Sequence, residues 1–396
     1  MSAPRECAVM STPPCFGRVR TFGRVASLAC LVALTGFAAA ESRSLLGVAT
    51  TASHEPASLS SAGKGPTDWR LVFERKNGRG LNILERGEPR ARVLVTFPAR
   101  ADDSAHPDWR PDGRRVAYTE GGRGLLVATL DGSTRKLPVG AGRIVGIAWA
   151  PDASYIAFNR ECRRGCGEGP GVYVIAATGG PAHRVIPSLA PRAGCSHLTD
   201  RPSGLSWSPD SRYVVASCNG EIVSVRRDGQ QRKKIASIRR NGIGTTVSWS
   251  PDGTLLAFGW HCQEGPVGGD VFCDVGVMAP NGKSKRTVYR DRYSGGPVDV
   301  MPPIWSSDSR LLLAIWGNGS AIARVDPARP GSGTQEVFAG VGWHLTAGPD
   351  GSFALLVQPG ATWLRSILHV ISRNGQHIDR RELPIAYDGA AAIWLG

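Results

Sequence analysis

Short apolar runs alternate with polar turn residues along the chain from about residue 66 onward. The stretch "VSWSPDGTLLAF", Val247 to Phe258, contains an apolar run ending in Trp, a Ser-Pro-Asp-Gly segment and a second apolar run. Ser, Pro and Gly favour the first, second and fourth positions of a β-turn, respectively. The pattern therefore predicts two short antiparallel strands joined by a tight turn.

The same pattern occurs six times, and a spacing of about 40 residues or more is typical of propeller and solenoid arrays. The copies begin at Asp108, Ile147, Leu205, Val247, Pro303 and Leu345. Five copies share a Trp, namely Trp109, Trp149, Trp207, Trp249 and Trp305. All six share a turn Asp, namely Asp112, Asp152, Asp210, Asp252, Asp308 and Asp350. The Trp residues are expected to pack between repeats. Ser307 replaces Pro and Gly348 replaces Ser in two copies, so looser turns are expected there.

A second turn signal follows four of the copies one strand later. These segments are "LDGS" at Leu130, "RDGQ" at Arg227, "PNGK" at Pro280 and "RNGQ" at Arg373. Asx-Gly pairs are strong hairpin signals. Each repeat is therefore predicted to form four antiparallel strands, and such units arranged radially make an all-β propeller.

The "W-S-P-D-G-x-x-[IVL]-A-[FY]" pattern resembles the WD40-like Pro-Asp (PD40) repeats of the TolB family. It is also similar to repeats in propeller domains of prolyl-oligopeptidase-type enzymes. The resemblance extends from about residue 66 to the C-terminus. It implies a β-propeller that binds a protein partner at the cell envelope.

The number of blades depends on the two ends of the repeat region. Trp69 to Phe97 has the pattern of three strands without a first one, and Ala390 to Gly396 supplies an Ile-Trp pair like that of a first strand. We therefore expect seven blades, closed by N- and C-terminal strands that share one blade. Six blades are the alternative if Trp69 to Phe97 is an appendage.

The first 66 residues lack this periodicity. Arg18, Arg20 and Arg24 precede the apolar run Val25–Ala40, which ends in small residues typical of a signal-peptide cleavage site. Residues 1–40 are thus interpreted as a Sec signal peptide, residues 41–66 as a flexible linker and residues 67–396 as the propeller. The apolar run is short for a membrane span. A periplasmic or extracellular location without a membrane span in the mature chain is expected.

Cysteine usage fits export. Six cysteines follow the leader, namely Cys162, Cys166, Cys195, Cys218, Cys262 and Cys273. An even number in an exported protein favours disulfides. The simplest pairing is Cys162–Cys166, Cys195–Cys218 and Cys262–Cys273, although other connectivities are open. A metal site using Cys162, Cys166, His197 and His261 is the alternative, but their spacing matches no zinc signature. No metal or cofactor is predicted.

The chain has a formal net charge of +14. No cluster of Lys and Arg is interleaved with aromatic residues, which argues against nucleic-acid binding. The charge is interpreted as diffuse, and an anionic cell-wall polymer is a candidate partner.

In an up-and-down sheet, all Pro-Asp and Asx-Gly turns lie at one end of the strands. The long insertions and all six cysteines lie at the other end, which we call the loop face. Variable loops on a rigid scaffold often carry binding residues. The loop-face candidates are His197, Asp200, His261, Glu264, Asp270, Asp274 and Asp299. Solvated surface charges, or paired carboxylates for glycoside chemistry, are the alternative interpretations.

A second candidate site lies six residues before each turn Asp, where the first strand begins. His106, Thr246 and His344 occupy this position and are expected at the channel mouth. They are candidates for binding a metal or an anionic ligand, or they line a wet channel. No Gly-x-Ser-x-Gly nucleophile motif is present. The favoured function is a secreted, non-catalytic scaffold that binds a macromolecule through its loop face. The alternative is an extracellular carbohydrate-active lyase or hydrolase, or a small-ligand binder, at the channel mouth.

Overall fold

The computed structural model describes fourteen segments of the chain. They are residues 68–75, 79–98, 105–162, 168–188, 204–218, 221–237, 246–264, 271–290, 303–315, 321–330, 333–339, 343–357, 366–383 and 391–396. All of them belong to one compact unit, Ser61–Gly396. The described residues form 28 strands and no helix.

Every strand pairs antiparallel with its neighbours. One sheet contains β28 (Ala391–Leu395), β1 (Trp69–Glu74), β2 (Gly80–Glu85) and β3 (Arg92–Thr96). An eight-stranded sheet contains β4 (Asp108–Trp109), β5 (Arg115–Glu120), β6 (Arg123–Thr129), β7 (Thr134–Leu137), β8 (Arg143–Trp149), β9 (Tyr155–Glu161), β10 (Gly171–Ala176) and β11 (His183–Pro187). It consists of two four-stranded units joined at the pair Arg123↔Arg143.

The remaining four sheets each contain four consecutive strands. The first two contain β12 (Leu205–Trp207), β13 (Tyr213–Cys218), β14 (Glu221–Arg226) and β15 (Lys233–Ser237), then β16 (Val247–Trp249), β17 (Leu256–Glu264), β18 (Val271–Met278) and β19 (Arg286–Tyr289). The last two contain β20 (Ile304–Trp305), β21 (Leu311–Ile315), β22 (Ala321–Val325) and β23 (Thr334–Ala339), then β24 (Trp343–Ala347), β25 (Phe353–Val357), β26 (Ser366–Ile371) and β27 (His377–Leu383).

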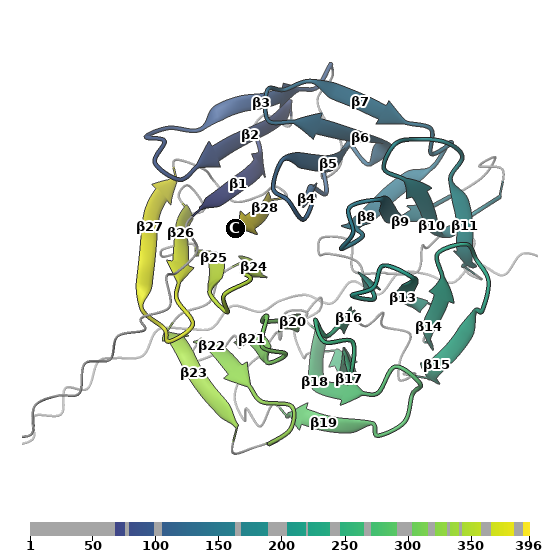
Figure 1. The fold of residues 1–396 in the computed structure, drawn as a ribbon, viewed down its shortest axis with the longest axis vertical. Helices are drawn as coiled ribbons and strands as arrows, with labels where there is room; N and C mark the ends of the chain where they lie inside the picture. The colour runs from purple at the N-terminus through teal and green to yellow at the C-terminus, as the bar shows by residue number, and fades with distance from the viewer. Residues whose placement is uncertain are drawn as a thin grey trace, which may run out of the picture. The chain divides into compact units, whose positions relative to one another are not determined.

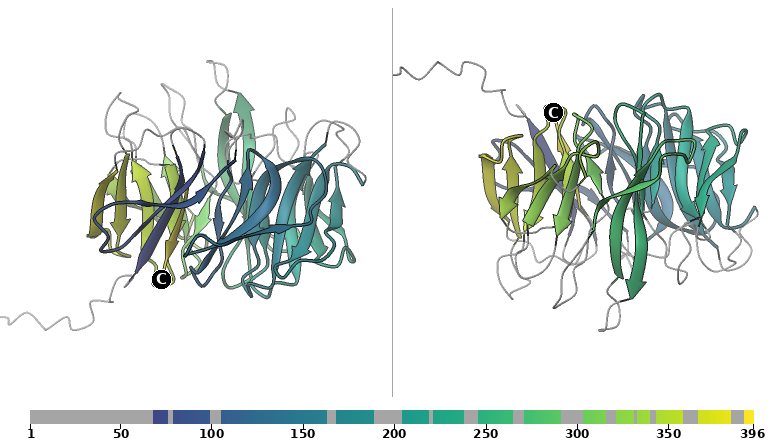
Figure 2. Two further views of the ribbon diagram at one scale, coloured as in Figure 1. Left: turned by 90° about the horizontal axis from the view of Figure 1, so that it is seen from above. Right: turned by 90° about the horizontal axis from the view of Figure 1, so that it is seen from below.

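The innermost strands of the sheets contact one another in cyclic order. The order is β28, β4, β8, β12, β16, β20, β24 and again β28. Within this unit the sheets follow one another around a ring, with β3, β7, β11, β15, β19, β23 and β27 on the circumference (Figure 1). Side views show the strands running between the two faces of the ring (Figure 2). The all-β propeller predicted from the sequence is confirmed.

The Ser-Pro-Asp-Gly turn is held by its own side chains. Ser250 Oγ donates to Asp252 at 2.6 Å and accepts the N–H of Leu255 at 2.9 Å. Asp252 Oδ1 accepts the N–H of Thr254 at 3.0 Å. Gly253 has a φ of +74°, which suits Gly. The motif therefore closes a turn and leaves few polar groups for a ligand.

The two atypical turns keep the hydrogen bond that closes the repeat turn. Ser309 N–H donates to the Ser306 carbonyl at 2.9 Å, as in the Pro-containing copies. Gly351 N–H donates to the Gly348 carbonyl at 3.2 Å, which is longer than the 2.8–2.9 Å of the Pro-containing copies. A Cβ at Gly348 would lie 2.5 Å from Ser352 Oγ, so the hydroxyl of Ser352 fills the space that a Ser at position 348 would need.

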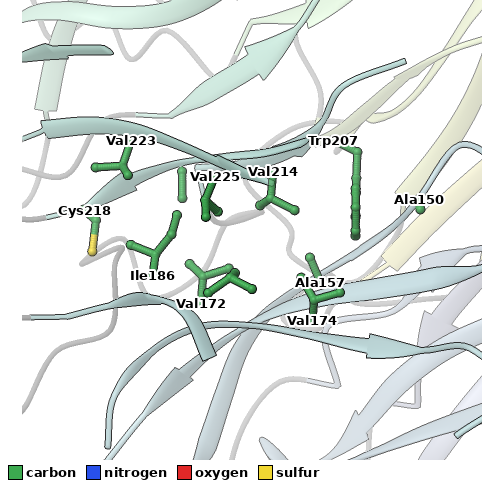
Figure 3. Packing of buried hydrophobic residues seen from close by; sticks show 12 residues of the cluster. Ala150, Ala157, Val172, Val174, Ile186, Trp207, Val214, Cys218, Val223 and Val225 are labelled. Atoms are coloured by element: carbon green, nitrogen blue, oxygen red, sulfur yellow. The ribbon is translucent and has the colours of Figure 1, made fainter. Parts of the chain in front are cut away.

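The repeated Trp side chains connect neighbouring sheets. Trp207 Nε1 donates to the Ala148 carbonyl at 3.0 Å, and Trp149 Nε1 donates to the Asp108 carbonyl at 3.2 Å. Trp207 also belongs to a cluster of buried side chains from both sheets, in which Ala157, Val174 and Val214 lie nearest to its ring (Figure 3). Trp249 is an exception, because its Nε1 donates to Gly253 of its own turn at 3.3 Å.

The two ends of the described unit meet in one sheet. β28 pairs with β1 in the register Leu71↔Ile393. Trp109 Nε1 donates to the Ala392 carbonyl at 3.0 Å, so Ala392 is equivalent to Asp108. The equivalent of the repeat Trp is therefore Ile393 and not Trp394, one residue away from the sequence-based assignment. Trp394 instead donates to the Pro111 carbonyl at 2.9 Å and covers Gly113.

Outer strands contain β-bulges, and the Asx-Gly turn of the next sheet contacts the bulged residue. The pairing of β2 with β3 skips Leu94, and that of β14 with β15 skips Ile235. A Cβ at Gly132 would lie 2.8 Å from the Leu94 carbonyl oxygen, and one at Gly282 would lie 2.3 Å from that of Ile235. The Asx-Gly turn thus needs Gly both for its backbone conformation and for contact with the preceding sheet.

Gly282→Ala is expected to destabilise the protein more than Gly229→Ala. Both glycines have φ near +84° (+83° and +84°), so each Ala suffers about 1–2 kcal/mol of backbone strain. Only the Ala at position 282 also overlaps a backbone oxygen, which adds roughly 1–3 kcal/mol. Urea unfolding of the two variants measures the difference. Equal losses of unfolding free energy would contradict the proposed contact.

A chain ending at Leu383 is expected to melt well below the full-length protein. It lacks the pairing of β28 with β1 and the burial of Ile393 and Leu395, each worth about 1.5–3 kcal/mol. A synthetic peptide of residues 384–396 should restore the melting temperature in a concentration-dependent manner. An unchanged melting temperature without the peptide would show that β28 does not close the ring.

Candidate functional site

Asp108 is an acidic side chain of the inner ring that the sequence analysis did not select. It lies on β4, and its Oδ2 accepts the N–H of Trp149 on β8 at 2.8 Å. Burial raises the pKa of Asp108 to about 7, and backbone hydrogen bonds from Trp149 and Trp109 oppose this rise. The equivalent positions hold Ala148, Ser206, Ser248, Ile304, Thr346 and Ala392. Comparison of the repeats could have singled out Asp108, because the other described sheets have small, hydroxyl or aliphatic residues at this position.

The two channel-mouth histidines have an unusual backbone. His106 precedes β4 with φ of +43°, and His344 lies in β24 with φ of +55°. Left-handed conformations are uncommon for residues other than Gly, and they cluster at functional sites. Burial lowers the pKa of His344 to about 4, so its imidazole is neutral at pH 7.

The structure places His106 and His344 on the two sheets that flank β28. Thr246 occupies the equivalent position before β16, but its backbone does not have a positive φ. Among the described residues, no group of three His, Cys, Asp or Glu side chains has metal-binding geometry. A ligand site at these residues stays a prediction.

The structure describes only some of the loop-face candidates and their neighbouring cysteines. His197, Asp200, Asp270, Asp299, Cys166 and Cys195 lie outside the described residues. For His261, Cys262, Glu264 and Cys273 the description is limited to backbone. Asp274 is described and forms an ion pair with Arg290 at 3.5 Å.

The segment from His261 to Asp274, expected to be a loop insertion, largely continues the hairpin of β17 and β18. The strands pair at Trp260↔Asp274 and again at Gln263↔Phe272 and Glu264↔Val271. The pairing shifts between Trp260 and Gln263, which puts the backbones of His261 and Cys262 opposite Cys273.

Cys162 and Cys218 are both disulfide-bonded. Cys162 follows the end of β9 and Cys218 ends β13, so both lie at the strand ends opposite to the Pro-Asp turns. The pairing of the six cysteines stays a prediction.

A buried arginine fixes the backbone beside Cys162. Arg160 Nη1 donates to the Val139 carbonyl at 2.8 Å, and its guanidinium lies 3.7 Å from the ring centre of Tyr173. Tyr173 Oη donates to the Gly169 carbonyl at 2.6 Å. Burial raises the pKa of Tyr173, partly opposed by the charge of Arg160. These contacts tie Arg160 of β9 and Tyr173 of β10 to the backbone at Val139 and Gly169.

No known protein family and no curated protein matches this sequence. In the part of the chain that the structure describes, no helix has the length and apolar character needed to span a bilayer. Several solved structures nevertheless share its architecture.

Oligogalacturonate lyase from Vibrio parahaemolyticus matches with a TM-score of 0.51 and 12% identity, over 81% of this chain and 85% of the lyase. TolB from Acinetobacter baumannii matches with a TM-score of 0.43 and 16% identity, over 82% and 81% of the two chains. Prolyl oligopeptidase B from Galerina marginata matches with a TM-score of 0.48 and 12% identity, over 70% of this chain and 44% of the peptidase. At these identities the similarity concerns the fold alone, which is that of a β-propeller protein.

Asp108→Asn is expected to stabilise the protein above pH 7. The carboxyl pKa rises from 3.8 to about 7 on folding, so folding favours the protonated form. Its contribution to stability is complete below about pH 4 and is lost as the pH rises through 7. The Asn variant keeps a hydrogen-bond acceptor and removes this loss. Its unfolding free energy should exceed that of the wild type at pH 8 and match it near pH 4.

Asp131→Asn provides a control of opposite sign. Hydrogen bonds from Thr129 and from the backbone and side chain of Ser133 lower the pKa of Asp131. Its stabilisation is therefore present at neutral pH and lost as the pH falls through the folded pKa. If both variants showed the same pH dependence, burial of Asp108 would not be the cause.

Non-reducing peptide mapping is expected to show Cys162–Cys166, Cys195–Cys218 and Cys262–Cys273. The backbone register of β17 and β18 favours the last pair, because Cys273 lies opposite Cys262. Any crossed pair between these loops would contradict the pairing.

Proposed function

We propose that this protein is an exported, seven-bladed and non-catalytic propeller that binds another macromolecule through its loop face. The apolar leader and the six later cysteines support export into an oxidising compartment. The pairing of β28 with β1 supports closure by the two ends of the ring.

The difference between the two ends of the sheets carries the proposal. At the turn end, β12 stops at Trp207 and β13 starts at Tyr213, and the intervening turn satisfies its own polar groups. At the loop face, β11 stops at Pro187 and β12 starts only at Leu205. A rigid frame with long connections at one end is suited to recognition.

Residues at the base of the loop face support a preorganised surface. Cys162 and Cys218 are held in disulfides, and Arg160 ties the backbone at Val139 and Gly169 to the ring of Tyr173. Loops held at their bases lose less conformational entropy when a partner binds. A protein partner at the cell envelope fits such a surface.

The inner ring supports a second candidate, a small-ligand or carbohydrate-active site. His106 and His344 both have left-handed backbone, and Asp108 lies two residues from His106 with a pKa of about 7. A carboxyl that titrates near neutrality is suited to acid–base chemistry. Among the described residues no group of three potential metal ligands occurs, which makes this the weaker candidate.

Affinity capture from the native envelope fraction distinguishes the two candidates. Replacing residues 261–273 by Asn-Gly shortens the hairpin to the pair Trp260↔Asp274 and removes part of the loop face. This variant is expected to lose capture of the partner by about tenfold or more while its melting temperature is kept.

Arg114→Gln combined with Arg212→Gln, on two Pro-Asp turns, is the matched control and should capture normally. His106→Ala combined with His344→Ala should also capture normally if the scaffold function is correct. The second candidate would be supported instead by two results together. The His variant would lose the ability to bind or turn over a carbohydrate, and the hairpin deletion would leave capture of the partner unaffected.

A further inference from the structure

The outer strands of four consecutive units carry exposed basic side chains next to one another. The exposed ones are Arg135 and Lys136 on β7, Arg184 on β11, Lys233 and Lys234 on β15, and Lys285 just before β19. Arg286, the first residue of β19, is half-buried. These strands follow one another along the circumference (Figure 1). These seven residues, among the 47 Lys and Arg of the chain, place positive charge on neighbouring strands in one sector of the rim.

Strand register puts one charge from each of β7, β11 and β15 at the same height on the rim. Lys136 pairs with Leu126, Arg184 with Tyr173 and Lys234 with Val223. These three partners lie opposite Tyr118, Phe158 and Ala216 on the second strands. The cations thus form a belt along the rim, which we call the basic rim.

Protection of exposed edges explains charge on outer strands but not its uniform sign. Lys commonly blocks pairing between edge strands of separate molecules, and acidic residues serve the same purpose. β23 has Glu336, and β27 has Asp379 and Glu382, whereas the sequences of β7, β11, β15 and β19 contain no acidic residue. The single sign over four neighbouring edges points to a ligand.

Two of these arginines donate to neutral backbone carbonyls and one of the lysines pairs with a carboxylate. Arg135 donates to the Thr178 carbonyl at 2.8 Å, and Arg286 donates to the Pro327 carbonyl at 3.1 Å, bonds that retain the full positive charge. Lys234 forms an ion pair with Glu221 at 2.6 Å. Its neighbour Lys233 is exposed and points to the other side of the strand.

We propose that the basic rim binds a flexible, linear anionic glycan that follows the circumference across several sheets. A flexible chain can follow a convex row of charges, whereas a planar bilayer would reach few of them. Single-stranded nucleic acid usually requires aromatic stacking platforms. Tyr289 is the sole aromatic residue in the sequences of these four strands. The basic rim is separate from the loop face, so this proposal does not depend on the proposed function.

Fluorescently labelled polygalacturonate oligomers of increasing length provide the probe, with binding measured by anisotropy at two salt concentrations. Affinity should increase with length as the chain reaches a second sheet. Lys233→Gln combined with Lys234→Gln should weaken binding of the long oligomers by about tenfold in low salt. It should also reduce the slope of log affinity against log salt concentration by roughly one or two, the number of counterions no longer released.

The control Arg114→Gln combined with Arg212→Gln removes the same charge from the Pro-Asp turns and should change binding by less than about twofold. Gln335→Lys combined with Glu336→Lys extends the basic rim onto β23 and should strengthen binding. Equal losses in the two Gln variants would overturn the proposal, because net charge alone would then explain binding. Stronger binding to anionic vesicles or to single-stranded DNA than to the glycan would also overturn it. Aggregation of the rim variant with unchanged affinity would identify edge protection as the role of these residues.

Discussion

Contact between neighbouring inner strands is the constraint on which the rest of this structure depends. Each inner strand is only two to seven residues long, so a single sheet has little surface with which to hold its neighbour. The Trp side chain solves this problem by combining a large apolar ring with one N–H group that reaches the next strand. At Trp109, Trp149, Trp207 and Trp305 that group donates to a carbonyl of the preceding inner strand. Side-chain acceptors on the same strands, Asp108 and Ser206, receive backbone N–H groups of Trp149 and Trp249 in return.

The two rims and the inner ring differ in their electrostatics. Turn carboxylates such as Asp252 are held by local hydroxyl and N–H donors, which lower their pKa against the opposing effect of burial. In the inner ring, burial dominates and shifts Asp108 and His344 toward their neutral forms. On the basic rim, cationic side chains face solvent and the strands themselves carry no acidic residue. Each region thus handles charge differently, and only the last is suited to binding a polyanion over a long distance.

Local patterns predicted the fold well because turn chemistry and strand alternation act over a few residues. The sequence therefore indicated the strands around each Pro-Asp turn and the packing role of Trp207. It misplaced the Trp equivalent in β28 because Ile393 and Trp394 are adjacent, and only pairing with Leu71 distinguishes them. It missed Asp108 and the basic rim for another reason. Burial of Asp108 depends on β8, and Lys136 and Lys234 become neighbours along the rim only once the sheets are arranged in a ring.

The sheet made by β28 and β1 has a consequence for the order of folding. β1 is the first described strand to leave the ribosome or a translocation channel, and its partner β28 is the last. Until then β1 has one unpaired edge, and contacts of such large sequence separation form slowly. The ring therefore cannot close until the segment that carries β28 is available to pair with β1, and the intervening sheets fold while that gap is still open.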